Sequence, residues 1–186
     1  VRRVLSVKAA IGLFDDPYRS LDPVREADTS QRAAHEALAR DAARRSIVLL
    51  EDDGAVLPVS RQARIALIGP FARDMDNIEG CWTLFGDRSR YVTLETGLRA
   101  ALPEGATLDV VDGCGLEAPL EGGIDAAVAA ARGADVVLLA VGEPQNYSGE
   151  EQSRHQIVLP AVQQQLAEAI AATGKPVVVL LRNGRA

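Results

Sequence analysis

Short apolar runs that alternate with helical segments constrain the fold of this chain more than any other feature. Four runs end in glycine or a polar turn: RIALIGP (64–70), TLDVVDG (107–113), ADVVLLAVGE (134–143) and KPVVVLLRNG (175–184). Between them, apolar residues recur at helical spacing over about 93–102, 121–132 and 158–173. Strands that are apolar on both faces and alternate with helices are typical of a parallel sheet covered on both sides.

A further run, SIVLLED (46–52), follows an Ala-rich stretch that has helical spacing and begins after Thr29, a candidate N-cap. Together these runs predict an α/β sandwich, with a mostly parallel sheet of about five strands and helices on both faces. Sites in such sheets gather beyond the carboxyl ends of the strands, where the loops are exposed.

Composition excludes several classes of partner. The net charge is −6 and the basic residues are scattered, so we expect no nucleic-acid partner. The apolar runs are far shorter than the ~20 residues of a membrane-spanning helix, so we expect no membrane partner. Cys81 and Cys114 lack zinc-site spacing, which predicts small buried hydrophobic residues or, as the alternative, one disulfide, and no metal.

Nucleotide-binding motifs and the motif of serine-triad hydrolases are missing from the sequence. No G-x-G-x-x-G or P-loop pattern occurs, so we expect no cofactor. No serine lies in G-x-S-x-G, and the chain has only two histidines, His35 and His155.

The longest irregular stretch in the regular part of the chain is GEPQNYSGEEQSR (142–154). A loop of this length inside a domain is either functional or disordered. Tyr147 and Arg154 can anchor it, and Ser148 and Gly149 permit a tight turn that projects Glu150. The competing interpretation of Glu150 is an ordinary solvated carboxylate.

The single tryptophan, Trp82, lies in EGCWTLFGD beyond another strand end. A lone tryptophan is more often part of a core. In a loop flanked by Gly80 and Gly86, however, it can also offer an apolar face to a sugar ring.

Several motifs in order resemble the second domain of glycoside hydrolase family 3, the family of β-glucosidases, β-xylosidases and related exo-acting enzymes. VRRVLSVKAAIGLFDDPYR is similar to the last helix and exit of that family's N-terminal (β/α)8 barrel. HEALARDAARRSIVLLEDDGAVLPV is similar to the linker helix and first strand of its α/β sandwich. RIALIGPFARD, GCWT, VTLETGLRAAL, ADVVLLAVGE, SGEEQSR and LPAVQQQLAEAIAATGKPVVVLLRNGRA then follow in the family's order.

The resemblance implies a domain division, with a terminal helix and linker over residues 1–28 that leave a missing barrel, and the α/β sandwich over 29–186. It implies that Glu150, in the motif S-G-E-x-x-[SD]-R, is the catalytic acid/base. It also implies that Arg154 and Ser153 shape the loop or the substrate side, with Trp82 lining the pocket. The nucleophilic aspartate belongs to the barrel, so we expect this chain to be inactive alone.

The partners implied are a β-linked glucoside or related oligosaccharide and the barrel of the same parent protein. The resemblance suggests a periplasmic or secreted protein, but no signal segment is present to assign a location. Glu51 departs from the family pattern, in which a lysine is usual. The alternative function is a non-catalytic carbohydrate-binding or scaffold module on the same fold.

Overall fold

The computed structural model describes residues 1–52 and 56–184. The chain divides into two compact units, Val1–Glu51 and Asp52–Ala186. The first unit contains three helices, α1 (Arg2–Ala10), α2 (Pro23–Ala27) and α3 (Arg32–Ser46). None of their side chains is buried, so the first unit has no core of its own.

The second unit is built on one parallel sheet of four strands. They are β1 (Ile65–Ile68), β2 (Leu108–Val111), β3 (Val136–Gly142) and β4 (Val177–Arg182). Their order is β2-β1-β3-β4, with Ile65 opposite both Leu108 and Val136, and Val137 opposite Val177. The two central strands are buried along their whole length, as the continuous apolar runs predicted.

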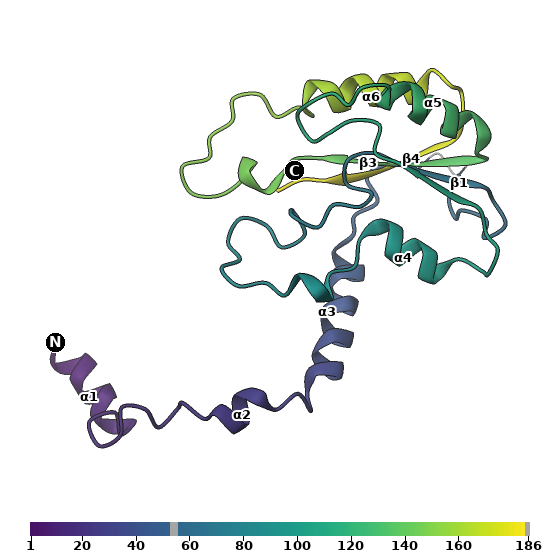
Figure 1. Ribbon diagram of the computed structural model, residues 1–186. Helices are drawn as coiled ribbons and strands as arrows, with labels where there is room; N and C mark the ends of the chain where they lie inside the picture. The colour runs from purple at the N-terminus through teal and green to yellow at the C-terminus, as the bar shows by residue number, and fades with distance from the viewer. Residues whose placement is uncertain (53–55, 185–186) are drawn as a thin grey trace. The chain divides into compact units, whose positions relative to one another are not determined.

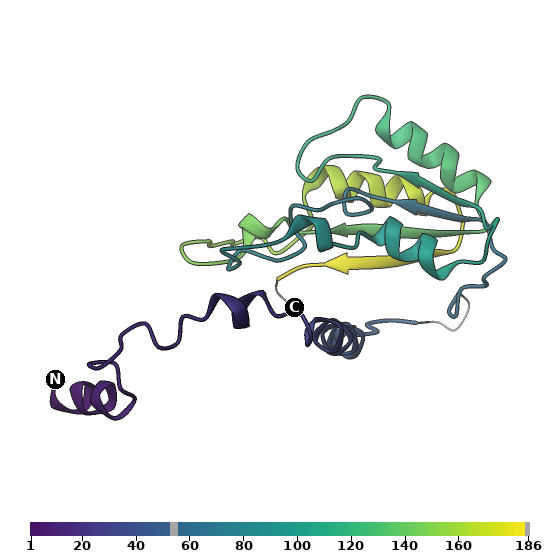
Figure 2. The ribbon, with the colours of Figure 1, turned by 60° about the horizontal axis from the view of Figure 1, so that its bottom comes forward.

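Helices cover both faces of the sheet. α5 (Gly123–Gly133) and α6 (Ala161–Ala171) lie side by side on one face, and α4 (Leu94–Ala101) lies on the other (Figures 1 and 2). Two short 3-10 helices, η1 (Arg88–Arg90) and η2 (Gln145–Tyr147), lie in the loops after β1 and β3. The predicted fold class, an α/β sandwich with a parallel sheet, is therefore confirmed.

Each face of the sheet has its own core. Beneath α5 and α6, small helix residues allow close packing, and the large side chains buried there include Ile68, Leu166 and Ile170. Beneath α4, Leu67 and Phe71 are fully buried, and Leu94 and Leu98 of the helix pack on them. Burial of each large aliphatic side chain stabilises the fold by roughly 1.5–3 kcal/mol, so this sheet provides a rigid base for its loops.

The predicted number of strands was too high. The sheet of the second unit has four strands. Residues 47–50, in the run SIVLLED, belong to the first unit and are not assigned to a strand.

Two smaller expectations were also wrong. α3 begins after Gln31, and Thr29 instead accepts a turn hydrogen bond from the backbone N–H of Arg32. Cys114 is buried, as expected, but Cys81 is exposed, and both thiols are free. Burial raises the pKa of the Cys114 thiol to about 11, which keeps it protonated.

Candidate functional site

All four strands end at one edge of the sheet because they are parallel. We call this edge and its loops the rim. Its loops are residues 69–93 after β1, 112–122 after β2, 143–160 after β3 and 183–184 after β4 (Figure 1). Ligand sites of open parallel sheets form at this edge.

The rim begins at a close contact between two strands. Gly142, the last residue of β3, has a φ of 153°, and a Cβ placed there would collide with the carbonyl of Arg182 in β4. Only glycine fits such an approach. The backbone N–H of Gly142 also donates to Oε1 of Gln163, a fully buried side chain of α6, at 2.8 Å. The start of the β3 loop is therefore fixed from two sides.

Glu150 lies in a tight turn of the β3 loop. Gly149 and Glu151 on either side have φ values of 125° and 62°, so the turn needs left-handed backbone at both positions. The Glu150 side chain is exposed and makes no hydrogen bond or ion pair with the described residues. The structure thus presents this carboxylate to the solvent at the rim.

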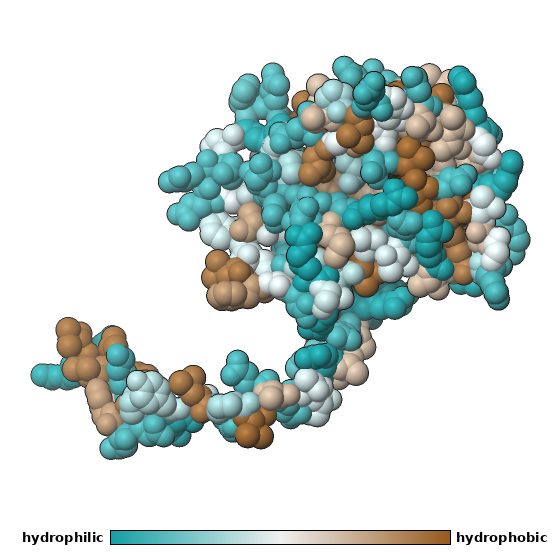
Figure 3. Space-filling model, in the orientation of Figure 1, coloured by the Kyte–Doolittle hydropathy of each residue, from teal (hydrophilic) through white to brown (hydrophobic). Residues whose placement is uncertain are grey.

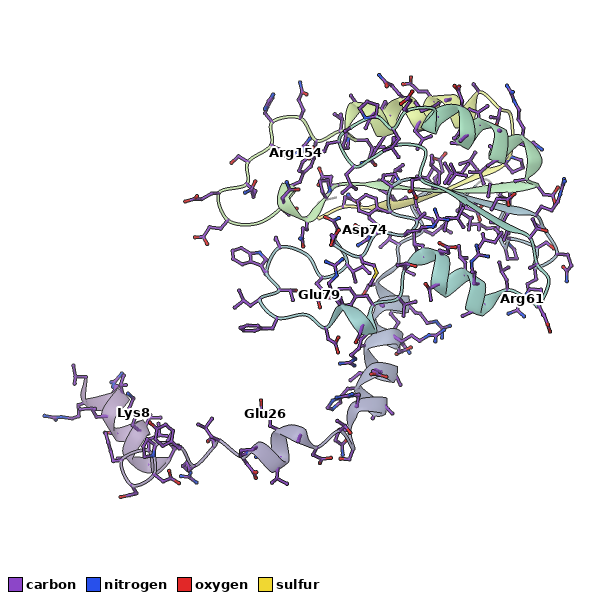
Figure 4. The ribbon with its side chains drawn as sticks, in the orientation of Figure 1. Lys8, Glu26, Arg61, Asp74, Glu79 and Arg154 are labelled. Carbon is purple, nitrogen blue, oxygen red and sulfur yellow. The ribbon has the colours of Figure 1, made fainter. Side chains whose placement is uncertain are left out.

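An aromatic and charged cluster anchors the β3 loop behind Glu150. The guanidinium carbon of Arg154 lies 3.7 Å from the centroid of the Tyr147 ring (Figure 4 labels Arg154). Its Nε lies 3.8 Å from Oε1 of Glu143, whose side chain is 7% exposed, and donates to the carbonyl of Gln156 at 3.3 Å. The Tyr147 hydroxyl donates to Glu117 in the loop after β2.

These contacts close the loop on itself, because they join residues on both sides of Glu150. Burial raises the pKa of Tyr147, and the hydrogen bond to Glu117 raises it further, so the phenol stays protonated as a donor. The guanidinium of Arg154 has partners within its own chain, which favours a bracing role over direct substrate contact.

Trp82 lies at the tip of the β1 loop. It is 69% exposed, and its neighbours Leu84 and Phe85 are 87% and 94% exposed. The resulting apolar patch is visible in Figure 3. The side chains of Tyr91 and Glu79, on either side of these exposed residues in the sequence, form a hydrogen bond. This hydrogen bond raises the pKa of Tyr91. The tip therefore exposes an apolar surface, and the hydrogen bond between Tyr91 and Glu79 links the two sides of the loop below it.

The loop that carries Trp82 and the loop that carries Glu150 contact each other at the rim. The backbone N–H of Gln145 donates to Oδ1 of Asn77 at 2.7 Å. A Cβ built at Gly149 would lie 3.1 Å from Sγ of Cys81, the residue before Trp82. Ser153 is exposed and makes no hydrogen bond with the described residues.

Sequence reasoning missed two contributors to the rim, Asn77 and Glu117. Both follow strands whose positions were predicted, so their place at the rim was foreseeable. Their partners are 68 and 30 residues away in the sequence, and such pairings depend on the strand order.

The described residues contain no cluster of three or more His, Cys, Asp or Glu side chains that could hold a metal ion. No helix in that part of the chain has the length and apolar character to span a bilayer. Every buried side-chain nitrogen or oxygen in the same part has a hydrogen-bond partner.

Curated relatives of this chain are glycosidases. The periplasmic beta-glucosidase of Salmonella typhimurium is 35% identical across 99% of this chain, and the beta-xylosidase of Formosa agariphila is 34% identical across 98%. The chain spans about a quarter of their length, 27% and 26%.

A beta-glucosidase from Listeria innocua, solved in complex with isofagomine, superposes with a TM-score of 0.88 at 38% identity. That match covers 98% of this chain and 25% of the other. The model of the glycosyl hydrolase family 3 C-terminal domain matches residues 47–186. The chain therefore belongs to glycosyl hydrolase family 3 and contains the C-terminal domain of that family.

Proposed function

We propose that this chain supplies the general acid/base, Glu150, to the active site of a retaining, exo-acting β-glycosidase. The nucleophile and most of the sugar pocket would lie in a (β/α)8 barrel of the same parent protein. Residues 1–28 would be the exit from that barrel, and residues 29–186 the sandwich domain. The proposed substrate class is β-linked glucosides and related oligosaccharides, and it is supported by relatives named as a beta-glucosidase and a beta-xylosidase.

One observation carries this proposal. The carboxylate of Glu150 stands unpaired among the described residues, at the tip of a loop that Tyr147 and Arg154 anchor from behind. A solvated carboxylate of no function needs no such anchoring. The anchored loop keeps the carboxylate exposed at the rim, where a second domain could reach it.

The chemistry requires two carboxyl groups. In retaining hydrolysis one attacks the anomeric carbon, and the other, ~5 Å away, protonates the departing oxygen and then activates water. A general acid keeps its proton near neutral pH when its surroundings exclude water. Docking of the barrel and a bound sugar would exclude water from Glu150, so the isolated chain is not expected to hydrolyse glycosides.

Trp82 and Arg154 have separate roles in this proposal. The exposed ring of Trp82 offers an apolar face to a sugar beside the reacting bond. Arg154 braces the loop through Tyr147 and Glu143, and Ser153 helps the chain turn between Glu150 and that brace.

The test is Glu150→Gln in the parent protein. The value of kcat/KM for phenyl β-glucoside, whose leaving group needs a proton, should fall by about 10²- to 10⁴-fold. For 2,4-dinitrophenyl β-glucoside, kcat/KM should change little, because the 2,4-dinitrophenolate leaving group departs without protonation.

Glu151→Gln is the matched control, because it removes the adjacent exposed carboxylate from the same turn. It should keep near-normal kcat/KM for both substrates. Undiminished hydrolysis of phenyl β-glucoside by the Glu150 variant would contradict the proposal.

A further inference from the structure

We propose that Asn77, in the loop after β1, is a positioning residue that sets the location of Glu150. The inference rests on the proposed acid/base role and adds a residue that the loop's own sequence does not contain. Its basis is a series of contacts that runs from the end of β4 through Asn77 to the start of the β3 loop.

The first link is an ion pair at the rim. Asp74 has a side chain that is only 7% exposed, and its Oδ2 lies 3.4 Å from Nη1 of Arg182, the last residue of β4. The Arg182 guanidinium also lies 4.8 Å from the centroid of the Phe71 ring, which is fully buried. The pair is therefore fixed to the sheet itself (Figure 4 labels Asp74).

Asn77 is held by both members of this pair. Its Nδ2 donates to Oδ1 of Asp74 at 2.7 Å, and its backbone N–H donates to Oδ2 at 3.1 Å. Its carbonyl accepts from Nη2 of Arg182 at 2.7 Å. With three such bonds, the position and the side-chain orientation of Asn77 are set jointly by Asp74 of its own loop and by Arg182 of β4, which pairs with Asp74.

The fixed amide then holds the β3 loop. Oδ1 of Asn77 accepts the backbone N–H of Gln145 at 2.7 Å. Gln145 starts the helical turn η2, whose end lies three residues before Glu150. The Asn77 side chain is a two-ended bridge, because one end donates to Asp74 and the other accepts from Gln145.

Two close contacts also confine the β3 loop beyond the Asn77 bridge. A Cβ at Gly184 would collide with Oγ of Ser148, and a Cβ at Gly149 would lie 3.1 Å from Sγ of Cys81. These contacts limit sideways movement of the loop. Loss of the Asn77 bridge removes the hydrogen bond at Gln145, so the segment between Gly142 and Glu150 can shift by a small distance while the loop remains packed in place.

A small shift matters for an acid that must reach one oxygen atom. Misplacement by about 1 Å can cost about 10²-fold in rate. Proton donation is needed only for a poor leaving group, so misplacement of Glu150 should be visible only with such substrates. A mutation that merely destabilises the protein lowers activity toward every substrate alike, which separates positioning from folding.

The variant Asn77→Ala in the parent protein removes both ends of the bridge. We expect kcat/KM for phenyl β-glucoside to fall about tenfold to 10²-fold, while kcat/KM for 2,4-dinitrophenyl β-glucoside changes less than about twofold. The matched control is Gln164→Ala on α6, which also removes one amide whose Nε2 donates at 3.0 Å, to Glu168, but touches neither loop. It should leave both values unchanged.

A second measurement uses the 186-residue chain and does not depend on catalysis. Amide hydrogen exchange at Gln145, followed by NMR, should quicken by about fivefold in Asn77→Ala, because its acceptor is lost. Amides of the buried strand β3 should keep their protection.

The outcomes separate the two proposals. Equal loss with both substrates, no loss with either, or unchanged exchange at Gln145 would overturn the role of Asn77. If Glu150→Gln itself leaves phenyl glucoside hydrolysis intact, the proposed function fails, whatever Asn77→Ala does. A fall for Glu150→Gln without a leaving-group-dependent fall for Asn77→Ala overturns the inference alone.

Discussion

At the scale of single residues, the planar guanidinium of Arg154 is the group that holds the Glu150 loop together. It stacks on Tyr147, approaches Glu143 and donates to a backbone carbonyl. Stacking of this kind contributes roughly 0.5–1 kcal/mol at a partly exposed site. The opening of the loop should therefore depend on the ring of Tyr147 in addition to its hydroxyl.

Two variants of the 186-residue chain test this dependence. Tyr147→Phe keeps the ring and loses the bond to Glu117, whereas Tyr147→Ala loses both. Limited trypsin digestion after Arg154 reports the opening of the loop. Its rate should rise about twofold to fivefold for the first variant and about tenfold for the second. Cleavage after the exposed Arg61 is the internal control, and equal rates for both variants at Arg154 would contradict the stacking argument.

The sequence predicted the local part of this site and not its long-range part. Glu150, Tyr147 and Arg154 were identifiable because they share one long loop. Asn77 and Glu117 were not, since each acts on a residue brought near by the strand order β2-β1-β3-β4, which a single sequence does not specify.

At the scale of elements, the regular part of the sheet could be predicted because burial on both faces leaves a continuous apolar signature. The run at 46–52 has the same signature, but residues 47–50 are not assigned to a strand in the first unit. An apolar run alone does not determine a strand, because a partner strand must also accept its backbone hydrogen bonds. Helix starts were less predictable, because α3 begins after Gln31 without a side-chain cap.

The starts of β1 and β3 are joined by a charged link that should make stability depend on pH. Nη2 and the backbone N–H of Arg64 donate to Asp135 at 2.6 and 2.8 Å. The side-chain bond from Arg64 is the largest cause that lowers the pKa of Asp135 from 3.8 to about 2. Because the folded-state pKa is depressed, this stabilisation is present above about pH 4 and is lost as the pH falls through about 2.

Asp135→Asn should therefore lower the thermal midpoint of the 186-residue chain at pH 7, and the difference should vanish near pH 2. Circular dichroism melts across that range measure it. Asp109→Asn, at an exposed position on β2, serves as the control and should change the midpoint little at pH 7. A difference for Asp135→Asn that stayed constant down to pH 2 would contradict the assigned link.

At the scale of the whole molecule, the chain spans about a quarter of its relatives' length and contains one tryptophan. Trp82 is 69% exposed, so its fluorescence reports directly on the tip of the β1 loop. If the sugar pocket lies mainly in a barrel, the isolated chain should bind sugars too weakly to detect.

Titration of the 186-residue chain with glucose or cellobiose should then leave the Trp82 emission unchanged. A saturable blue shift would instead support the alternative of a carbohydrate-binding module, because a sugar stacked on the ring would exclude water from it. The variant Trp82→Phe gives the baseline for any change that does not arise from this residue.

The shared edge at which the parallel strands end has a practical consequence for engineering. Residues 82–85 and 151–153 lie beyond the last buried positions of β1 and β3, so their replacement disturbs little of the interior. Libraries meant to change glycoside preference can therefore randomise these two tips, while Asn77, Tyr147 and Arg154 stay fixed as the frame that supports them.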